Sequence, residues 1–389
     1  MGGTKMKKIF LILMVLFCVS ISADEFEEFQ KQQNAEYKKY QKNLQEEFRL
    51  YQVAYDKAFK EFSKTLSTKW PEEKGKPDIS NKSKFVEYDK NLNSKKVVNF
   101  KKKNISLEVI AKTEKEAKEK MEKMFNDLLK EDVKTAYKRD LLEKKVAKKL
   151  KKQRKAPKSS QKLIADILNH QEKMEMKKKL KKQKLVLVKH KGKFIYKANV
   201  KMPPNSMIRK AKTFKSDVMK NSKKEKIPAE LIYAIIHSES SFNPMARSHI
   251  PAFGLMQIVP RSAGIDSYQY LYKKKRLLTS SYLYDSSKNI MIGSAYLHVL
   301  YHRYLKRIKD PQSRLYCAIA AYNTGAGNVA KTFTGNTNIN KAAVTINKLT
   351  PQQVYKKLIS NLPYNETRKY LKKVNDRVSA YNKLLKTTI

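Results

Sequence analysis

The sequence has few of the residues that several common kinds of protein depend on. Only 2 of its 389 residues are cysteines, Cys18 and Cys317, which excludes a disulfide-stapled scaffold and a cysteine-rich zinc site. Its one notable apolar run, residues 9–21, is too short for a transmembrane helix, which excludes a multi-span membrane protein. Acidic residues are also scarce, with 36 Asp and Glu against 85 Lys and Arg. Since hydrophobic residues reach 41%, the chain can still build a core, and its length suits two domains.

The first residues have the order of a secretory signal peptide. Lysines at 5, 7 and 8 precede the apolar run, and the small residues Ser20, Ser22 and Ala23 follow it. The pattern predicts a signal peptide over residues 1–23 and a mature protein in the periplasm. A lipid attached at Cys18, which would associate the protein with the outer membrane, is the alternative, although Phe17 stands where such signals have a small residue.

The net charge of +49 predicts attraction to a polyanion. Composition alone does not choose between nucleic acid, an anionic membrane surface and an acidic polymer outside the membrane. The export signal makes nucleic acid the least favoured of the three, and no zinc-finger spacing or recognition-helix pattern supports it. We therefore expect no nucleic-acid partner and keep an anionic membrane surface as a secondary one.

Residues 24–204 predict an α+β N-terminal domain with long amphipathic helices and β-hairpins. Apolar and aromatic residues recur three or four apart over 26–66 and again over 114–150, which favours two long helices. Residues 97–110 and 185–200 read as two hairpins, each with a Lys-rich turn. His170 and His190 are isolated, so we expect no metal site and no cofactor there. Pro203-Pro204 marks the end of this domain.

Residues 205–389 lack strand patterns and predict an all-α domain. Residues 228–236 begin with proline and are apolar nearly all round, which indicates a buried helix, and Pro244 requires that helix to stop by about residue 243. Glu239 therefore falls in the last turn of a buried helix. Apolar surroundings and the negative end of the helix dipole both favour its protonated form, which a general acid requires.

Three further segments carry polar or aromatic groups suited to sugar binding. After Glu239 comes a loop with Ser248, Phe253, Met256 and Gln257, in which the aromatic and thioether groups offer surface to a sugar ring. The pair Tyr322-Asn323 precedes a Gly-rich turn. Glu366 and Tyr370 are four residues apart, which places them on one helix face.

These segments resemble the lytic transglycosylases, whose catalytic domain is goose-lysozyme-like. The resemblance rests on residues 239–244 (Glu-Ser-Ser-Phe-Asn-Pro), 246–248, 254–258 (Gly-Leu-Met-Gln-Ile), 321–327 and 366–370, in the family's order and spacing. Residues 282–297 and, more loosely, 85–88 and 98–111 extend it toward the membrane-bound lytic murein transglycosylases of type C, including their N-terminal α+β domain.

The resemblance implies a lysozyme-like fold and cleavage of the β-1,4 bond between N-acetylmuramic acid and N-acetylglucosamine in peptidoglycan, leaving a 1,6-anhydro ring. Glu239 would be the single general acid and base. The substrate-binding residues implied are Ser248, Phe253, Met256, Gln257, Tyr322, Asn323, Glu366 and Tyr370. No cofactor is implied.

Two alternatives stay open at this point. A hydrolytic muramidase would share the fold and use water in place of the sugar's own hydroxyl group. Ordinary glycoside hydrolases need a second carboxylate, and residues 222–389 hold only 8 acidic residues, among them Asp266 and Asp285. The other alternative is a non-catalytic scaffold that binds the cell wall.

Overall fold

The computed structural model describes residues 23–72 and 75–387. Cys18 and nearly all of the predicted signal peptide lie outside the described residues. By its internal contacts the chain divides within helix α2 (Ala23–Ser67) into Met1–Arg49 and Leu50–Ile389. The sheet, the helical region and Glu239 all belong to the second unit. The domain boundary at Pro204 stays a prediction.

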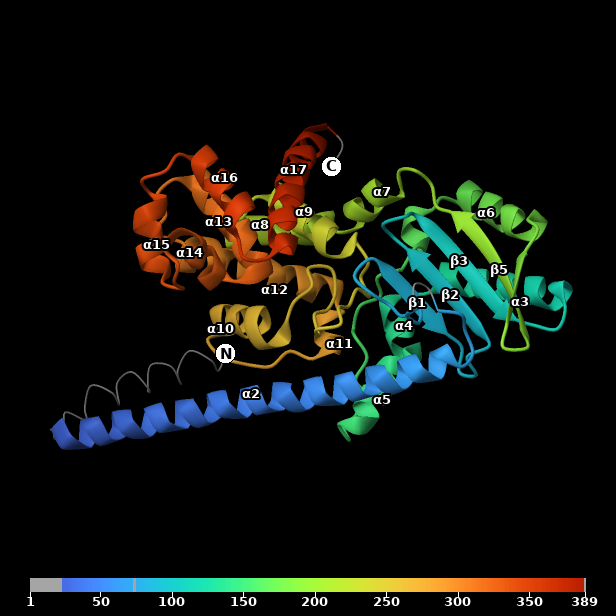
Figure 1. The fold of residues 1–389 in the computed structure, drawn as a ribbon, viewed down its shortest axis with the longest axis horizontal. Coiled ribbons are helices and arrows are strands. Elements are labelled where there is room, and N and C mark those ends of the chain that lie inside the picture. Colours follow the sequence, from blue (N-terminus) through green and yellow to red (C-terminus); the bar gives the residue numbers. More distant parts are fainter. Residues whose placement is uncertain (1–22, 73–74, 388–389) are drawn as a thin grey trace, which may run out of the picture. The chain divides into compact units, whose positions relative to one another are not determined.

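Five strands in the described residues form one antiparallel sheet (Figure 1). They are β1 (Lys84–Tyr88), β2 (Ser94–Asn99), β3 (Asn104–Ile110), β4 (Val186–His190) and β5 (Lys193–Lys201), in the order β1-β2-β3-β5-β4. Val98 pairs with Ile105 and Val188 with Ile195, so both predicted hairpins are confirmed. Strand β1 forms one edge of the sheet, and the sequence analysis did not predict this strand.

The two faces of the sheet are covered by different helices. Helices α3 (Glu114–Lys130) and α6 (His170–Lys182) contact the sheet and each other, so they share one face. Since neighbouring residues of a strand point to opposite faces, Tyr196 joins the core with these helices while Ile195 joins a second core. That second core holds Tyr55 from the later part of α2, so the aromatic stripe packs against the sheet from residue 51 onward.

The predicted single helix over 114–150 is wrong, because two aspartates divide it. The segment forms α3, α4 (Val133–Arg139) and α5 (Leu141–Lys149), and a short 3₁₀ turn η1 (Ala165–Ile167) follows. The Asp132 carboxylate accepts a hydrogen bond from the Thr135 N–H at 2.8 Å, and Asp140 accepts one from Glu143 N–H at 3.0 Å. Each aspartate therefore caps the start of a new helix.

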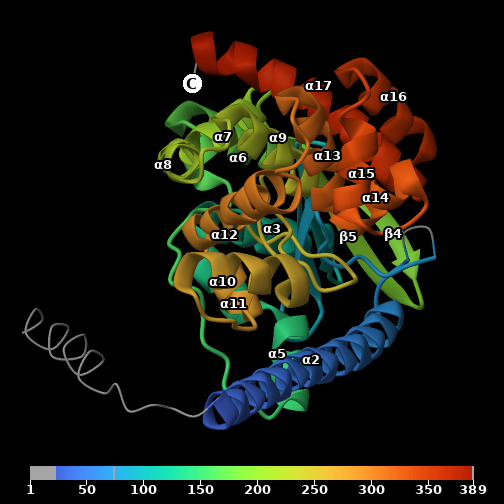
Figure 2. The same ribbon diagram turned by 90° about the vertical axis from the view of Figure 1, so that its left-hand side faces the viewer.

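The C-terminal part is helical, which confirms the predicted fold class of an α+β region followed by an all-α region (Figure 2). Its helices are α7 (Ser206–Thr213), α8 (Lys215–Glu225), α9 (Ala229–Ser240), α10 (Ile265–Tyr272), α11 (Ser280–Leu283), α12 (Ser286–His298), α13 (Pro311–Thr324), α14 (Ala326–Thr334), α15 (Ile339–Ile346), α16 (Pro351–Asn361) and α17 (Asn365–Thr387). Two π-helical turns, η2 (Pro260–Gly264) and η3 (Val299–Tyr304), lie between them. No described helix combines the length and apolar character that crossing a membrane requires.

Two buried polar contacts join the α4–α5 region to the helical part. Arg247 forms an ion pair with Asp140, and the side chains of both are nearly inaccessible. The Ser280 hydroxyl donates to the buried Glu143 carboxylate at 2.9 Å. A buried charge without its partner is costly, so these contacts fix how the loop around Arg247 meets α5.

Replacing Asp140 tests this arrangement. We expect Asp140→Ala to lower the free energy of unfolding by about 3–5 kcal/mol, because it leaves the Arg247 guanidinium buried without its partner. Asp132→Ala is the matched control, since it removes only a helix cap and a partly exposed ion pair, and should cost ~1 kcal/mol. Urea unfolding of both variants measures the difference, and equal losses would contradict the assigned role of the Arg247 pair.

Candidate active site

Glu239 lies where the sequence placed it, in the last turn of the buried helix α9. Residues 231–236 of this helix are buried without exception, and Glu239 is only 5% exposed. The helix ends because Ser241 takes a left-handed conformation with φ 52°, and its N–H donates to His237 O at 3.2 Å. Helix α17 runs beside α9 in both ribbon views and covers it.

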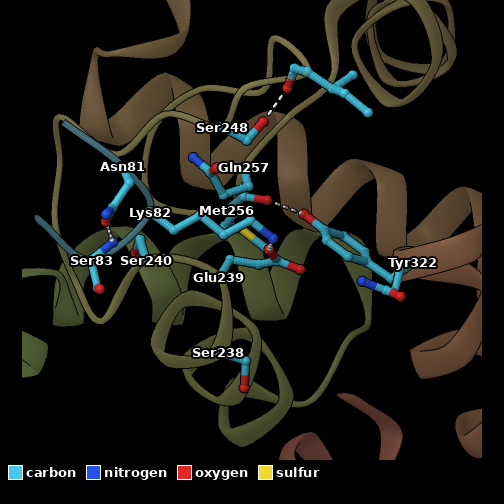
Figure 3. Close-up of polar contacts among 12 residues, drawn as sticks. Asn81, Lys82, Ser83, Ser238, Glu239, Ser240, Ser248, Met256, Gln257 and Tyr322 are labelled. Carbon is cyan, nitrogen blue, oxygen red and sulfur yellow. Dashed lines mark hydrogen bonds and ion pairs between the residues drawn. The ribbon is translucent and has the colours of Figure 1, made fainter. Parts of the chain in front are cut away.

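A lysine from the sheet region reaches this carboxylate. Lys82, in the loop just before β1, places its Nζ 3.4 Å from Glu239 Oε2 (Figure 3). The Lys82 side chain is 43% exposed and that of Glu239 is 6% exposed. Sequence analysis missed Lys82, since nothing in its surroundings distinguishes it among the chain's other lysines.

Two tyrosines from separate helices also face Glu239. Burial, followed by the charge of Glu239, raises the pKa of both Tyr322 in α13 and Tyr370 in α17 well above the usual value of 10. The Tyr322 hydroxyl donates to Met256 O at 2.8 Å. The Tyr370 hydroxyl is buried, and it interacts with the Glu239 carboxylate beside it. The structure therefore brings these two predicted site residues together with Glu239.

The C-terminal end of α9 is surrounded by cations from α17. Lys373 Nζ donates to Ser238 O at 3.3 Å, and Arg377 Nη1 donates to Ser238 Oγ at 2.8 Å. Burial, with the charges of Arg377 and Lys373, lowers the pKa of His237 to about 3. His237 is therefore neutral near pH 7, and cations complement the negative end of the helix dipole.

Asn289 in α12 holds the loop that carries Met256 and Gln257. Its Nδ2 donates to Phe253 O at 2.8 Å and Leu283 O at 2.7 Å, and its Oδ1 accepts from Met256 N at 2.8 Å. Asn289 is fully buried, so three of its hydrogen bonds stabilise one loop conformation. Gln257 has φ 49°, donates to Gly254 O at 3.0 Å, and has a buried Oε1 for which the described residues offer no partner.

Three of the predicted binding side chains have internal partners instead. Phe253 is fully buried and packs edge-on against the Tyr284 ring, with centroids 5.5 Å apart. Met256 is also fully buried, so its backbone carbonyl rather than its side chain meets Tyr322. The Ser248 hydroxyl donates to Ile250 O and points away from Glu239 (Figure 3).

Asn323 and Glu366 occupy different surroundings although their motifs are close together. Asn323 Oδ1 accepts a hydrogen bond from the Thr367 hydroxyl at 2.7 Å, which ties the end of α13 to the start of α17. Glu366 itself is exposed in the first turn of α17, whereas Tyr370 one turn later is buried. The motif's contact to Asn323 thus comes from Thr367, which the sequence analysis did not single out.

The other two acidic residues considered from the sequence are engaged elsewhere. Asp266 accepts a hydrogen bond from the Tyr304 hydroxyl at 3.1 Å, and burial raises its pKa. Asp285 caps α12 by accepting from Lys288 N at 3.1 Å. Within the described residues, no group of three or more His, Cys, Asp or Glu is placed to hold a metal ion.

Comparison with known proteins confirms the resemblance to lytic transglycosylases over part of the chain. Residues 217–345 match the family model described as the transglycosylase SLT domain. Membrane-bound lytic murein transglycosylase C of Klebsiella pneumoniae (strain 342) is 41% identical over 189 residues, which are 49% of this chain and 52% of that protein. The protein of the same name from Sodalis glossinidius is 40% identical over the same shares. The chain thus spans about half the length of the curated relatives it matches.

Among solved structures, an inactive mutant of lytic transglycosylase Slt from Pseudomonas aeruginosa matches with 24% identity and a TM-score of 0.36, over 46% of this chain and 25% of that one. The 70 kDa soluble lytic transglycosylase of Escherichia coli matches with 16% identity and a TM-score of 0.34, over 70% of this chain and 44% of that one.

A pair of glycine substitutions tests how tightly Asn289 holds the loop that carries Met256 and Gln257. Gly254 has φ 75°, and a Cβ there would collide with Asn289 Nδ2 and Leu283 O. Gly192 in the β4–β5 turn has φ 73° with open space around it. We expect Gly192→Ala to cost ~1 kcal/mol of unfolding free energy and Gly254→Ala at least ~2 kcal/mol more. Thermal unfolding measures both, and similar melting temperatures would contradict the tight packing at Gly254.

Proposed function

We propose that residues 205–389 are the catalytic domain of a peptidoglycan lytic transglycosylase with Glu239 as its acid and base. The observation that carries the proposal is the buried carboxylate of Glu239 at the end of α9, faced by Tyr322 and Tyr370. The SLT family match, which covers α9 and the loop after it, supports the proposal.

The reaction would proceed in two proton transfers. Protonated Glu239 gives its proton to the glycosidic oxygen as the bond from that oxygen to C1 of the N-acetylmuramic acid breaks. The Glu239 carboxylate then takes the proton of the C6 hydroxyl while that oxygen bonds to C1. The products are a free hydroxyl on the departing N-acetylglucosamine and a 1,6-anhydro ring, and Glu239 is protonated again. One carboxyl group thus serves both steps.

Two buried polar atoms near Glu239 suit sugar binding. Gln257 Oε1 has no hydrogen-bond partner among the described residues, which is costly unless a ligand supplies one, and the Tyr370 hydroxyl has the Glu239 carboxylate as its neighbour. We assign to both a hydrogen bond with the sugar at the scissile bond. Tyr322 holds the Met256 backbone, and Asn323 with Thr367 holds the two helices that carry the tyrosines.

The remaining predicted residues have weaker or indirect parts in this proposal. Ser248 and Met256 would shape the loop, and Phe253 would support it from beneath, since its ring is buried. Glu366 is exposed at the start of α17, where it can meet only a more distant part of the glycan.

The names of the relatives support a place in the cell envelope. We propose that the protein acts on peptidoglycan outside the inner membrane, after removal of residues 1–23, with outer-membrane association through Cys18 as the less favoured form. The N-terminal region would be the α+β domain of the type C enzymes, spanning 24–204.

The mass of the released products and the substitution Glu239→Gln together test the proposed activity. We expect the chain from residue 24 onward to release muropeptides lighter by one water than hydrolysis products, measured by mass spectrometry. Glu239→Gln should lower the rate by about 10²–10⁴-fold, because it removes the proton donor. Glu230→Gln, in the first turn of the same helix, is the matched control and should keep its rate.

Each other outcome supports a different function. Hydrated products would make the protein a muramidase. No products from a chain that still binds the sacculus would favour the scaffold. Near-normal activity of Glu239→Gln would refute the assigned role of Glu239.

The charge of the chain predicts salt-dependent binding. With a net charge of +49, the protein should be drawn to the carboxylates of peptidoglycan stem peptides. We expect the fraction of Glu239→Gln protein that sediments with purified sacculi to fall clearly between 0.05 and 0.5 M NaCl (about a threefold change in Debye length). An unchanged fraction would show that charge does not drive the binding.

A further inference from the structure

The contact between Lys82 and Glu239 links regions far apart in the sequence. Lys82 belongs to the loop that enters strand β1, and Glu239 ends α9, a sequence separation of 157 residues. Nζ of Lys82 lies 3.4 Å from Glu239 Oε2 (Figure 3). The proposed roles above give this lysine no function.

The backbone of the Lys82 loop is held from both sides. Asn243 Nδ2 donates to the backbone oxygens of Asn81 and Lys82, at 3.4 Å each. Asn243 is itself fully buried, and its Oδ1 accepts from Met245 N at 3.0 Å. The Asn81 side chain accepts from the N–H groups of the next residues, including Ser83 at 3.0 Å. The loop is therefore docked on the segment that follows Glu239, which places Lys82 beside the carboxylate.

We propose that Lys82 is a positioning residue for Glu239, so that the sheet region supplies part of the active site. Its ammonium group would hold the Glu239 carboxylate that remains after the proton has passed to the leaving oxygen. The proposal rests on the proposed function for its catalytic consequence, whereas the pairing of the two charges can be tested without it.

The other groups that face Glu239 do not replace this cation. Tyr322 and Tyr370 have pKa values raised well above 10 by burial and by Glu239, so both stay neutral. Lys373 also interacts with the charge of Glu239, but its Nζ donates to Ser238 O. Burial, and then the charge of Arg377, lowers the pKa of Lys373.

The sign of the effect follows from the charges. A cation beside Glu239 stabilises the negative charge that develops on the carboxylate as the proton passes to the leaving oxygen. Without that cation, the chemical step should be slower, while binding of the glycan should not change. The loss should therefore fall on kcat rather than on KM.

Three substitutions in the full chain test the pairing. Lys82→Met removes the charge, and Lys82→Arg keeps it. Lys115→Met, on the exposed side of α3, is the matched control, because it removes one charge from the same sheet region away from Glu239. The first measurement is a double-mutant cycle of melting temperatures, in which Lys82→Met and Lys115→Met are each combined with Glu239→Gln.

We expect Lys82→Met to lower the melting temperature of the parent chain more than that of the Glu239→Gln chain, where the pairing of charges is already lost. Lys115→Met should change the melting temperature of both chains by the same amount. In muropeptide release, Lys82→Met should lower kcat about tenfold with KM unchanged, and Lys82→Arg should restore most of the rate.

Melting-temperature changes that simply add for Lys82→Met and Glu239→Gln would overturn the proposal, as would an equal coupling for Lys115→Met. A rate that Lys82→Arg does not restore, or a raised KM with unchanged kcat in Lys82→Met, would also overturn it. Coupled melting temperatures in a chain that releases no muropeptides would support the pairing and refute the proposed function.

Discussion

The burial of α9 is the constraint on which the surroundings of Glu239 depend. A helix that is apolar on all sides has to be covered on all sides, and α8 and α17 contact it directly. Its last turn carries a carboxylate into that interior, where an unpaired charge is costly. Lys82 and the tyrosines Tyr322 and Tyr370 come from three different segments and meet at that one position.

The parts of the fold that depend on local pattern could be predicted from the sequence. Both hairpins follow from β-rich runs on either side of short turns, and the structure contains both. The position of Glu239 also followed locally, from an apolar segment that proline ends. Tyr322 and Tyr370 were predicted as site residues from sequence motifs, and in the structure both lie against Glu239.

The rest could not be predicted because it depends on contacts between distant segments or on capping. Asp132 and Asp140 interrupt an apolar pattern that continues through them, and only the capping hydrogen bonds show the breaks. Phe253 looked available for a sugar ring, but Tyr284 from another segment covers it. The sequence did not mark Lys82 as a site residue, since lysine is abundant throughout this chain.

The ion pair between Asp140 and Arg247 also has a consequence for how the chain folds. The partners are 107 residues apart, and Ser280 and Glu143 are 137 apart. Contacts of such high contact order require large loops to close before they stabilise anything, and this slows folding. Lys82 and Glu239, 157 residues apart, meet under the same constraint, so we expect the surroundings of Glu239 to be complete only once the sheet region and the helices have met. A nascent or half-folded chain would hold the carboxylate without the neighbours that define its chemistry.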